Sequence, residues 1–161
     1  MSEPLYAGVV RPEWIDYNGH MNDSWYAWVF SRALDRMMGL IGLKQEGRTA
    51  DSATIYTLTA TIHYLAEVRE GESFAVDGRI LAHDAKRLRL WADMRRADGT
   101  LAASTEQIFL CVDQSAGQPR AAPFPPDAMA QIERLHAERA HEPTPAMAGR
   151  GISLEKRPGT A

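Results

Sequence analysis

One apolar stripe constrains the fold of this chain more than any other feature. Between residues 21 and 41, apolar side chains recur at spacings of mostly three or four, which predicts an amphipathic helix of about five turns. Asn22 or Asp23 suits the N-cap of this helix, and Gly39 or Gly42 suits its end. The stripe consists of Met21, Trp25, Trp28, Val29, Leu34, Met37 and Ile41.

Four β-rich stretches follow the helix, at residues 55–64, 73–82, 87–96 and 101–112, after a polar loop over residues 43–52. Asp98-Gly99 is a strong hairpin signal between the last two stretches. Because the connections are too short for crossover helices, we expect the four strands to form an antiparallel meander. A further strand, interrupted near Pro12, is expected within residues 5–15.

A single long helix must bury its apolar stripe, and the face of the sheet is the only large surface available. The sequence therefore predicts an α+β fold in which a curved antiparallel sheet of about five strands wraps a central helix. Asp127 is expected to cap a C-terminal helix that buries Met129, Ile132 and Leu135. Residues 1–140 are expected to form one domain, and residues 141–161 a mobile or loosely attached tail rich in Pro and Gly. Uncovered sheet edges favour self-association.

Composition excludes several classes of function. A formal charge of −3 provides no global attraction for nucleic acid or for an anionic membrane. Cys111 is the only cysteine, so an internal disulfide and a multi-cysteine zinc site are excluded, and the five histidines lack metal-ligand spacing. No apolar run is long enough to span a membrane and no signal peptide is visible, so we expect a cytoplasmic protein.

Residues 14–22 are the stretch that points to chemistry. Asp16 stands just ahead of the helix N-terminus, where first-turn amides lack intrahelical partners and favour negative charge. Such amides can hold a carbonyl oxygen as it becomes an oxyanion, while a carboxylate attacks the carbonyl or activates a water. A purely structural interpretation also fits, in which Asp16 caps a turn, Gly19 permits it and His20 packs.

This stretch resembles the signature of hotdog-fold acyl-CoA thioesterases of the 4-hydroxybenzoyl-CoA thioesterase type, over roughly residues 5–138. The resemblance implies that Asp16 is the catalytic carboxylate and that the backbone at Gly19, His20, Met21 and Asn22 polarises the thioester carbonyl. It also implies homodimers or homotetramers with active sites at the subunit interface, CoA bound as part of the substrate, and no metal or other cofactor. Asp23 departs from the second Asn that many members have. The residues that carry the resemblance are Asp16, Gly19, His20, Met21, Asn22 and Tyr26, supported by Ile62 to Leu65, Glu67, Gly71-Glu72, Asp98-Gly99 and Val112-Asp113.

Residues 13–22, 29–30 and 84–88 are similar to the betainyl-CoA thioesterases of carnitine breakdown. Their product, betaine, carries a trimethylammonium group, which proteins bind with aromatic faces. Trp14, Tyr17 and Tyr26 are the expected cage residues, Tyr64 and Trp91 can reach from the sheet, and Trp25 and Trp28 are expected mainly to pack. Two alternatives stay open: a thioesterase for aromatic or short aliphatic acyl groups, and a non-catalytic binder of acyl-CoA or betaine-like ligands.

Three further polar residues are candidates. Lys86 and Arg87 are expected to contact CoA phosphates, although a solvated strand face explains them equally well. His63 can face the site and orient a water or the carboxylate, but it also fits a hydrogen-bonded structural histidine.

Overall fold

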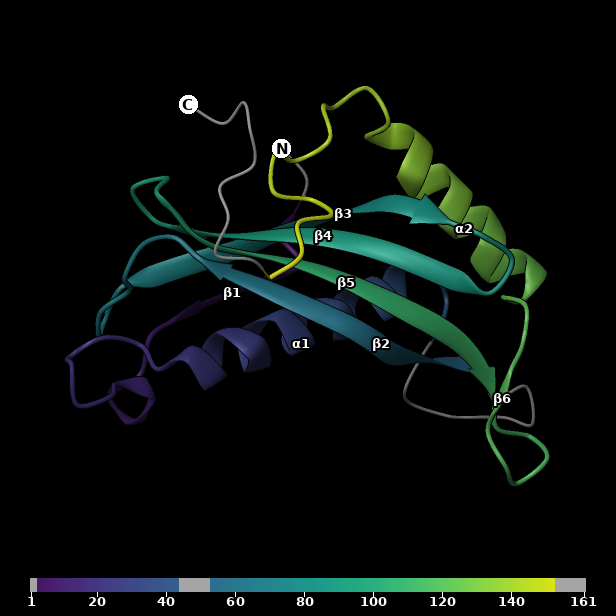
Figure 1. The fold of residues 1–161 in the computed structure, drawn as a ribbon, viewed down its shortest axis with the longest axis horizontal. Helices are drawn as coiled ribbons and strands as arrows, with labels where there is room; N and C mark the ends of the chain where they lie inside the picture. The colour runs from purple at the N-terminus through teal and green to yellow at the C-terminus, as the bar shows by residue number, and fades with distance from the viewer. Residues whose placement is uncertain (1–2, 44–52, 153–161) are drawn as a thin grey trace.

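The computed structural model describes residues 3–43 and 53–152 and contains one antiparallel sheet with a helix on each face (Figure 1). The strands are ordered β1-β3-β4-β5-β2, and a short β6 pairs with β5. The expected polar loop lies, apart from Leu43, outside the described residues. The elements are β1 (Tyr6–Val9), a 3-10 turn (Pro12–Trp14), α1 (Asp23–Leu40), β2 (Ala53–Tyr64), β3 (Ser73–His83), β4 (Arg87–Arg96), β5 (Leu101–Asp113), β6 (Arg120–Ala121) and α2 (Pro126–Glu138).

The central helix α1 forms as its periodicity predicts. The Asn22 side chain accepts a hydrogen bond from the Ser24 amide at 3.0 Å, so Asn22 is the N-cap. Gly42 follows the helix with a φ of +81°, a left-handed conformation that glycine adopts without strain. Val29 and Phe30 are among the helix residues buried in the core, together with alternate residues of β4 from Leu88 to Met94. The predicted burial of the apolar stripe against the sheet is confirmed.

The pairing of β2 differs from the expected four-strand meander. β3, β4 and β5 pair in sequence, but β2 pairs with β5 at the far side of the sheet and not with β3. Residues 65–72 connect β2 to β3 and pass the start of α1, where Val68 is fully buried and its carbonyl accepts the Met21 amide at 2.8 Å. This connection bypasses β4 and β5, so the meander prediction was wrong for β2.

The C-terminal helix differs at its start. Pro125 occupies the N-cap position and Pro126 the first turn, whereas Asp127 lies inside the first turn. Proline is favoured in the first turn because an N–H at that position would have no intrahelical acceptor, so its absence costs no hydrogen bond. The prediction that Asp127 caps α2 was therefore wrong, although α2 itself is present and buries Ile132.

The chain after α2 is anchored on the outer face of the sheet, opposite α1. Arg79 of β3 is only 9% exposed and donates to Glu142 at 2.9 Å and to the Pro143 carbonyl. Arg139 donates to the Gly78 carbonyl at 3.1 Å, and farther along the Gly149 amide donates to Glu106 at 2.6 Å. The expectation of a loose tail beyond His141 was wrong for the described part, because the buried Arg79 side chain and the Glu106 carboxylate hold it to the sheet.

We predict that Arg79→Met lowers the free energy of unfolding by about 1–3 kcal/mol, because Glu142 and the Pro143 carbonyl lose their donor. Urea denaturation measures this change. Arg134→Met is the matched control, since the printed contacts of Arg134 are exposed ones within α2, to Gln131 and Glu138, and the change is expected to alter stability by less than ~0.5 kcal/mol. Equal losses in the two variants would contradict the prediction.

Candidate active site

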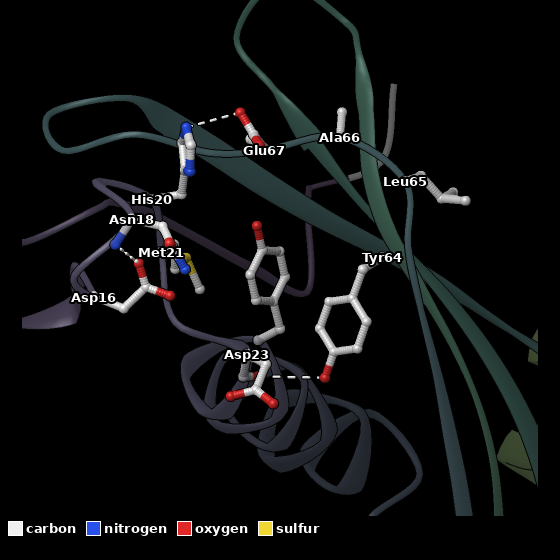
Figure 2. Close-up of a pocket in the computed structure, with 10 residues that line it drawn as sticks. Asp16, Asn18, His20, Met21, Asp23, Tyr64, Leu65, Ala66 and Glu67 are labelled. Carbon is white, nitrogen blue, oxygen red and sulfur yellow. Dashed lines mark hydrogen bonds and ion pairs between the residues drawn. The ribbon is translucent and has the colours of Figure 1, made fainter.

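A cavity of about 660 Å³ lies where the loop before α1, the first turn of α1 and the end of β2 meet (Figure 2). Asp16 and the first residue of α1 line one side, and the end of β2 with its following connection lines the other. The full lining consists of Asp16, Asn18, His20, Met21, Asp23, Tyr26, Tyr64, Leu65, Ala66 and Glu67.

Asp16 is held by a tight turn and keeps one carboxylate oxygen unused. The Asn18 amide donates to Asp16 Oδ1 at 2.8 Å, and the Gly19 amide donates to the Asp16 carbonyl at 3.0 Å. Gly19 has a φ of +80°, where a side chain would be strained. Within residues 3–43 and 53–152, Asp16 Oδ2 has no hydrogen-bond partner. The turn-capping role and a chemical role are therefore compatible, because each can use a different oxygen.

Most amides of the loop are already engaged. Besides the Gly19 amide, the Met21 amide donates to Val68 at 2.8 Å and the Asn22 amide to the Trp14 carbonyl at 2.9 Å. The expectation that the amides of Gly19, Met21 and Asn22 polarise a carbonyl is therefore corrected, since these groups hold the loop together. Among the described residues from Asp16 to Asp23, the amides of Tyr17, His20 and Asp23 have no acceptor. The Asp23 amide starts α1, where the helix dipole favours negative charge.

His20 ties the loop to the connection after β2. Its Nε2 lies 2.7 Å from Glu67 Oε2 (Figure 2). In the sequence, Leu65 and Glu67 only support the family resemblance, and Ala66 gives no signal. All three enter the lining because the connection folds back against the start of α1.

Two of the predicted cage tyrosines line the cavity. The rings of Tyr26 and Tyr64 lie 5.3 Å apart at an angle of 89°, in an edge-to-face arrangement. Burial raises the pKa of the Tyr26 phenol, although the backbone of Val68 opposes this with a hydrogen bond, and burial also raises the pKa of Tyr64. Both phenols therefore stay neutral at physiological pH.

The other two predicted cage residues lie elsewhere. Trp14 is only 2% exposed and stacks on Trp25 with ring centroids 4.9 Å apart. It therefore packs in the core with Trp25, which the sequence had predicted to pack, and not in a cage. Tyr17 is 96% exposed and does not line the cavity. The placement of Trp14 as a cage residue is corrected, because the 3-10 turn directs its indole toward α1.

Comparison with known sequences shows the family of this chain. Residues 10–132 match the thioesterase-like superfamily. The chain belongs to this superfamily. It is 40% identical over 157 residues to the betainyl-CoA thioesterase of Pseudomonas aeruginosa, covering 96% of this chain and 98% of that protein. It is also 37% identical to the L-carnitine dehydrogenase/betainyl-CoA thioesterase of Agrobacterium fabrum, covering 92% of this chain but 30% of that longer protein.

Solved structures agree with this assignment. A Staphylococcus aureus protein solved in complex with CoA superposes with a TM-score of 0.84 at 30% identity, covering 93% of this chain and 94% of that one. A putative thioesterase from Pseudomonas putida KT2440 gives a TM-score of 0.81 at 33% identity, covering 97% and 99%. The hotdog fold and the enzyme class expected from the sequence, a thioester hydrolase, are confirmed.

The expected phosphate contacts of this thioesterase lie far from the cavity within one subunit. Lys86 lies in the β3–β4 turn and Arg87 begins β4, at the opposite end of the sheet from the connection that lines the cavity (Figure 1). Hydrogen bonds from the amide of Lys86 and from Arg87 lower the pKa of Asp84 to about 2. Arg87 is thus engaged, whereas the Lys86 ammonium has no ion-pair partner among the described residues.

His63 also lies outside the cavity. It neighbours Tyr64 on β2, and side chains alternate along a strand, so the two point to opposite faces. Its ring stacks near Trp91 at 6.1 Å, and its buried Nε2 has no hydrogen-bond partner in the described part of the chain. His63 therefore does not orient a group at Asp16 within one subunit, and Trp91, on the same face as His63, does not line the cavity either.

The described residues contain no group of three His, Cys, Asp or Glu side chains placed to hold a metal ion. In the same part of the chain, no helix is long and apolar enough to cross a membrane.

We predict that Asn22→Ala lowers the free energy of unfolding of the thioesterase by about 1 kcal/mol, because the Ser24 amide loses its cap. The free energy of unfolding of Asn22→Asp should stay within a few tenths of a kcal/mol of wild type, since aspartate caps a helix as well as asparagine. Thermal or urea unfolding followed by circular dichroism measures both. An aspartate variant as unstable as the alanine variant would rule out the capping role.

Proposed function

We propose that this thioesterase hydrolyses betainyl-CoA to betaine and CoA. The observation that carries the proposal is the unused Asp16 Oδ2 beside a cavity lined by the perpendicular Tyr26 and Tyr64 rings. Aromatic rings are the groups with which proteins bind quaternary ammonium ions, which cannot donate hydrogen bonds. The relative in Pseudomonas aeruginosa, which this chain matches almost end to end, carries that activity in its name.

The proposed reaction uses Asp16 in one of two ways. Oδ2 attacks the thioester carbonyl, expels the CoA thiolate and leaves an anhydride that water hydrolyses, or Oδ2 takes a proton from a water that attacks the carbonyl directly. In both cases water is consumed, the C–S bond breaks, and betaine, CoA and a proton are the products. The amides of His20 and Asp23, free of other acceptors in the described residues, are suited to hold the developing oxyanion. A cytoplasmic location is part of this proposal.

We predict that Asp16→Asn folds normally and loses at least ~10²-fold in turnover, the usual scale for removing a general base. Asparagine can still accept the Asn18 amide, so the turn is kept. Release of free thiol from betainyl-CoA measures the loss, and Asp35→Asn serves as the control because Asp35, within the described part of the chain, pairs only with Arg32 on α1. Retained activity in the Asp16 variant would remove Asp16 from the mechanism. Tight binding of acyl-CoA by wild type without thiol release would instead favour the non-catalytic binder.

We further propose that the active enzyme is a homo-oligomer joined through β2. Among the described residues this strand pairs only with β5, which leaves its other edge unpaired there, and Tyr56 and Leu58 on this strand are exposed. Unpaired edges that carry apolar side chains favour pairing with another chain. The open side of the cavity is lined by Tyr64 and Leu65 at the end of the same strand, so a second copy there would help to enclose the substrate.

Antiparallel pairing of two β2 edges would also explain the position of Lys86. Such pairing brings the β3–β4 turn of the second copy to the end of the sheet at which the Asp16 cavity lies. Lys86 and Arg87 of the second copy are then placed to meet the phosphates of a CoA whose acyl group lies in the cavity. Lys86 is the stronger candidate, because Arg87 is paired with Asp84.

We predict that Leu58→Glu weakens self-association and lowers turnover by at least ~10-fold, because it places a charge on the 53%-exposed edge side chain where copies would meet. Light scattering coupled to gel filtration gives the mass, and thiol release gives the activity. Val9→Glu is the matched control, since Val9 is an exposed residue on β1, the opposite edge of the sheet. If the Leu58 variant kept the oligomer mass of wild type, or if the Val9 variant lost as much oligomer mass as the Leu58 variant, the role of β2 would be contradicted.

A further inference from the structure

Three carboxylates line the cavity, and they differ in how they are compensated. One oxygen of Asp16 accepts the Asn18 amide, and Glu67 is paired with His20 at 2.7 Å. The carboxylate of Asp23, in contrast, has no hydrogen-bond or ion-pair partner in the described ranges 3–43 and 53–152. The described lining residues also include no Lys or Arg, so His20 is the one group there that can carry positive charge. Asp23 is thus the one carboxylate of the three whose side chain has no hydrogen-bond or ion-pair partner among the described residues.

Asp23 lies directly beside one of the two aromatic rings. The Tyr64 hydroxyl donates to the Asp23 carbonyl at 3.4 Å, and Figure 2 shows the Asp23 carboxylate next to this contact, at the start of α1. Burial is the main cause of the raised pKa of the Tyr64 phenol, and the nearby charge of Asp23 raises it further. A ligand that lies against the Tyr64 ring is therefore also close to the Asp23 charge.

We propose that Asp23, acting with the Tyr26–Tyr64 pair, selects the charge of the acyl group: it attracts a quaternary ammonium, repels an anionic acyl group and leaves a neutral group of the same shape without this attraction. This inference rests on the proposed function and assigns its substrate preference to a residue. The rings supply attraction for a cation without hydrogen bonds, and Asp23 adds a direct charge–charge interaction. Asp16 is assigned to the reaction and Glu67 is paired with His20, so Asp23 is the lining carboxylate left for this role.

A structural role for Asp23 makes a different prediction. An acidic residue in the first turn of a helix stabilises that helix through the dipole, whatever ligand is bound. If this were its only role, Asp23→Asn would lower thermal stability and affect all ligands alike. Charge selection instead changes the ratio between a cationic and a neutral ligand. The two roles are separated by measuring that ratio.

The decisive experiment is calorimetric binding of two unreactive CoA thioethers to the full chain. One carries a 2-(trimethylammonio)ethyl group on sulfur, and the other carries the isosteric 3,3-dimethylbutyl group, in which carbon replaces the charged nitrogen. Wild type should bind the cationic analogue more tightly. Asp23→Asn should reduce this preference by about tenfold, the scale of one charge pair a few ångströms apart in a partly solvated site, while leaving the neutral analogue within about twofold.

Two controls complete the design. Asp127→Asn removes an acid from the first turn of α2, away from the cavity, and should leave the preference unchanged. Raising the salt concentration should weaken the preference in wild type more than in Asp23→Asn, because exposed charges are screened. A preference that is absent in wild type, or that Asp23→Asn leaves intact, overturns the inference.

Turnover of betainyl-CoA and of 3,3-dimethylbutyryl-CoA separates this inference from the proposed function. If wild type binds the cationic thioether selectively through Asp23 but releases no thiol from betainyl-CoA, charge selection stands and the proposed reaction fails. If both thioesters are hydrolysed with a ratio that Asp23→Asn does not change, the thioesterase stands and the role of Asp23 fails.

Discussion

The hydrogen bond from the Met21 amide to the Val68 carbonyl is the contact on which the site depends. It joins the loop that precedes α1 to the connection between β2 and β3, two segments that are far apart in the sequence. The Asn22 amide binds Trp14 on the other side, so the loop that holds Asp16 is fixed from both directions. Because Val68 is fully buried, this arrangement cannot shift without opening the core. The rigidity of Asp16 therefore follows from backbone groups and from burial, not from contacts of its own side chain with other side chains.

Local patterns predicted the elements well and their long-range pairing poorly. The helix from Asp23 to Leu40 and the strands followed from side-chain periodicity and from turn residues such as Asp98-Gly99, which act within a few positions. The pairing of β2 with β5 was missed, because it depends on how residues 65–72 cross the end of the sheet. The anchored segment after α2 was missed for a similar reason. Its composition is typical of a loose tail, but Arg79, about 60 residues earlier, supplies the hydrogen bonds that hold it.

In the candidate site, too, local features were predicted from the sequence and long-range contacts were not. The stretch from Asp16 to Asn22 identified the loop, the helix start and the carboxylate from sequence alone. It did not show which amides were free, because the acceptors of the Met21 and Asn22 amides lie on Val68 and Trp14. Nor did it distinguish aromatic side chains that face the cavity from those that pack. Trp14 and Tyr26 are equally plausible by position, yet one is stacked under Trp25 and the other faces Tyr64.

Charge is distributed along the sheet in a way that suits a substrate whose two ends carry opposite charge. CoA is a polyanion, whereas the proposed acyl group is a cation, so one uniform field cannot favour both. The cavity has carboxylates and no Lys or Arg among its described lining residues, while the β3–β4 turn carries Lys86 and Arg87 at the other end of the sheet. Within one subunit, the cavity and the β3–β4 turn can contact the same ligand only if that ligand spans the whole sheet. Antiparallel pairing of two sheets through β2 would shorten it, because the basic end of one copy then faces the acidic end of the other. The same edge strand that leaves one subunit incomplete would thereby place the two charges where the two ends of the substrate need them.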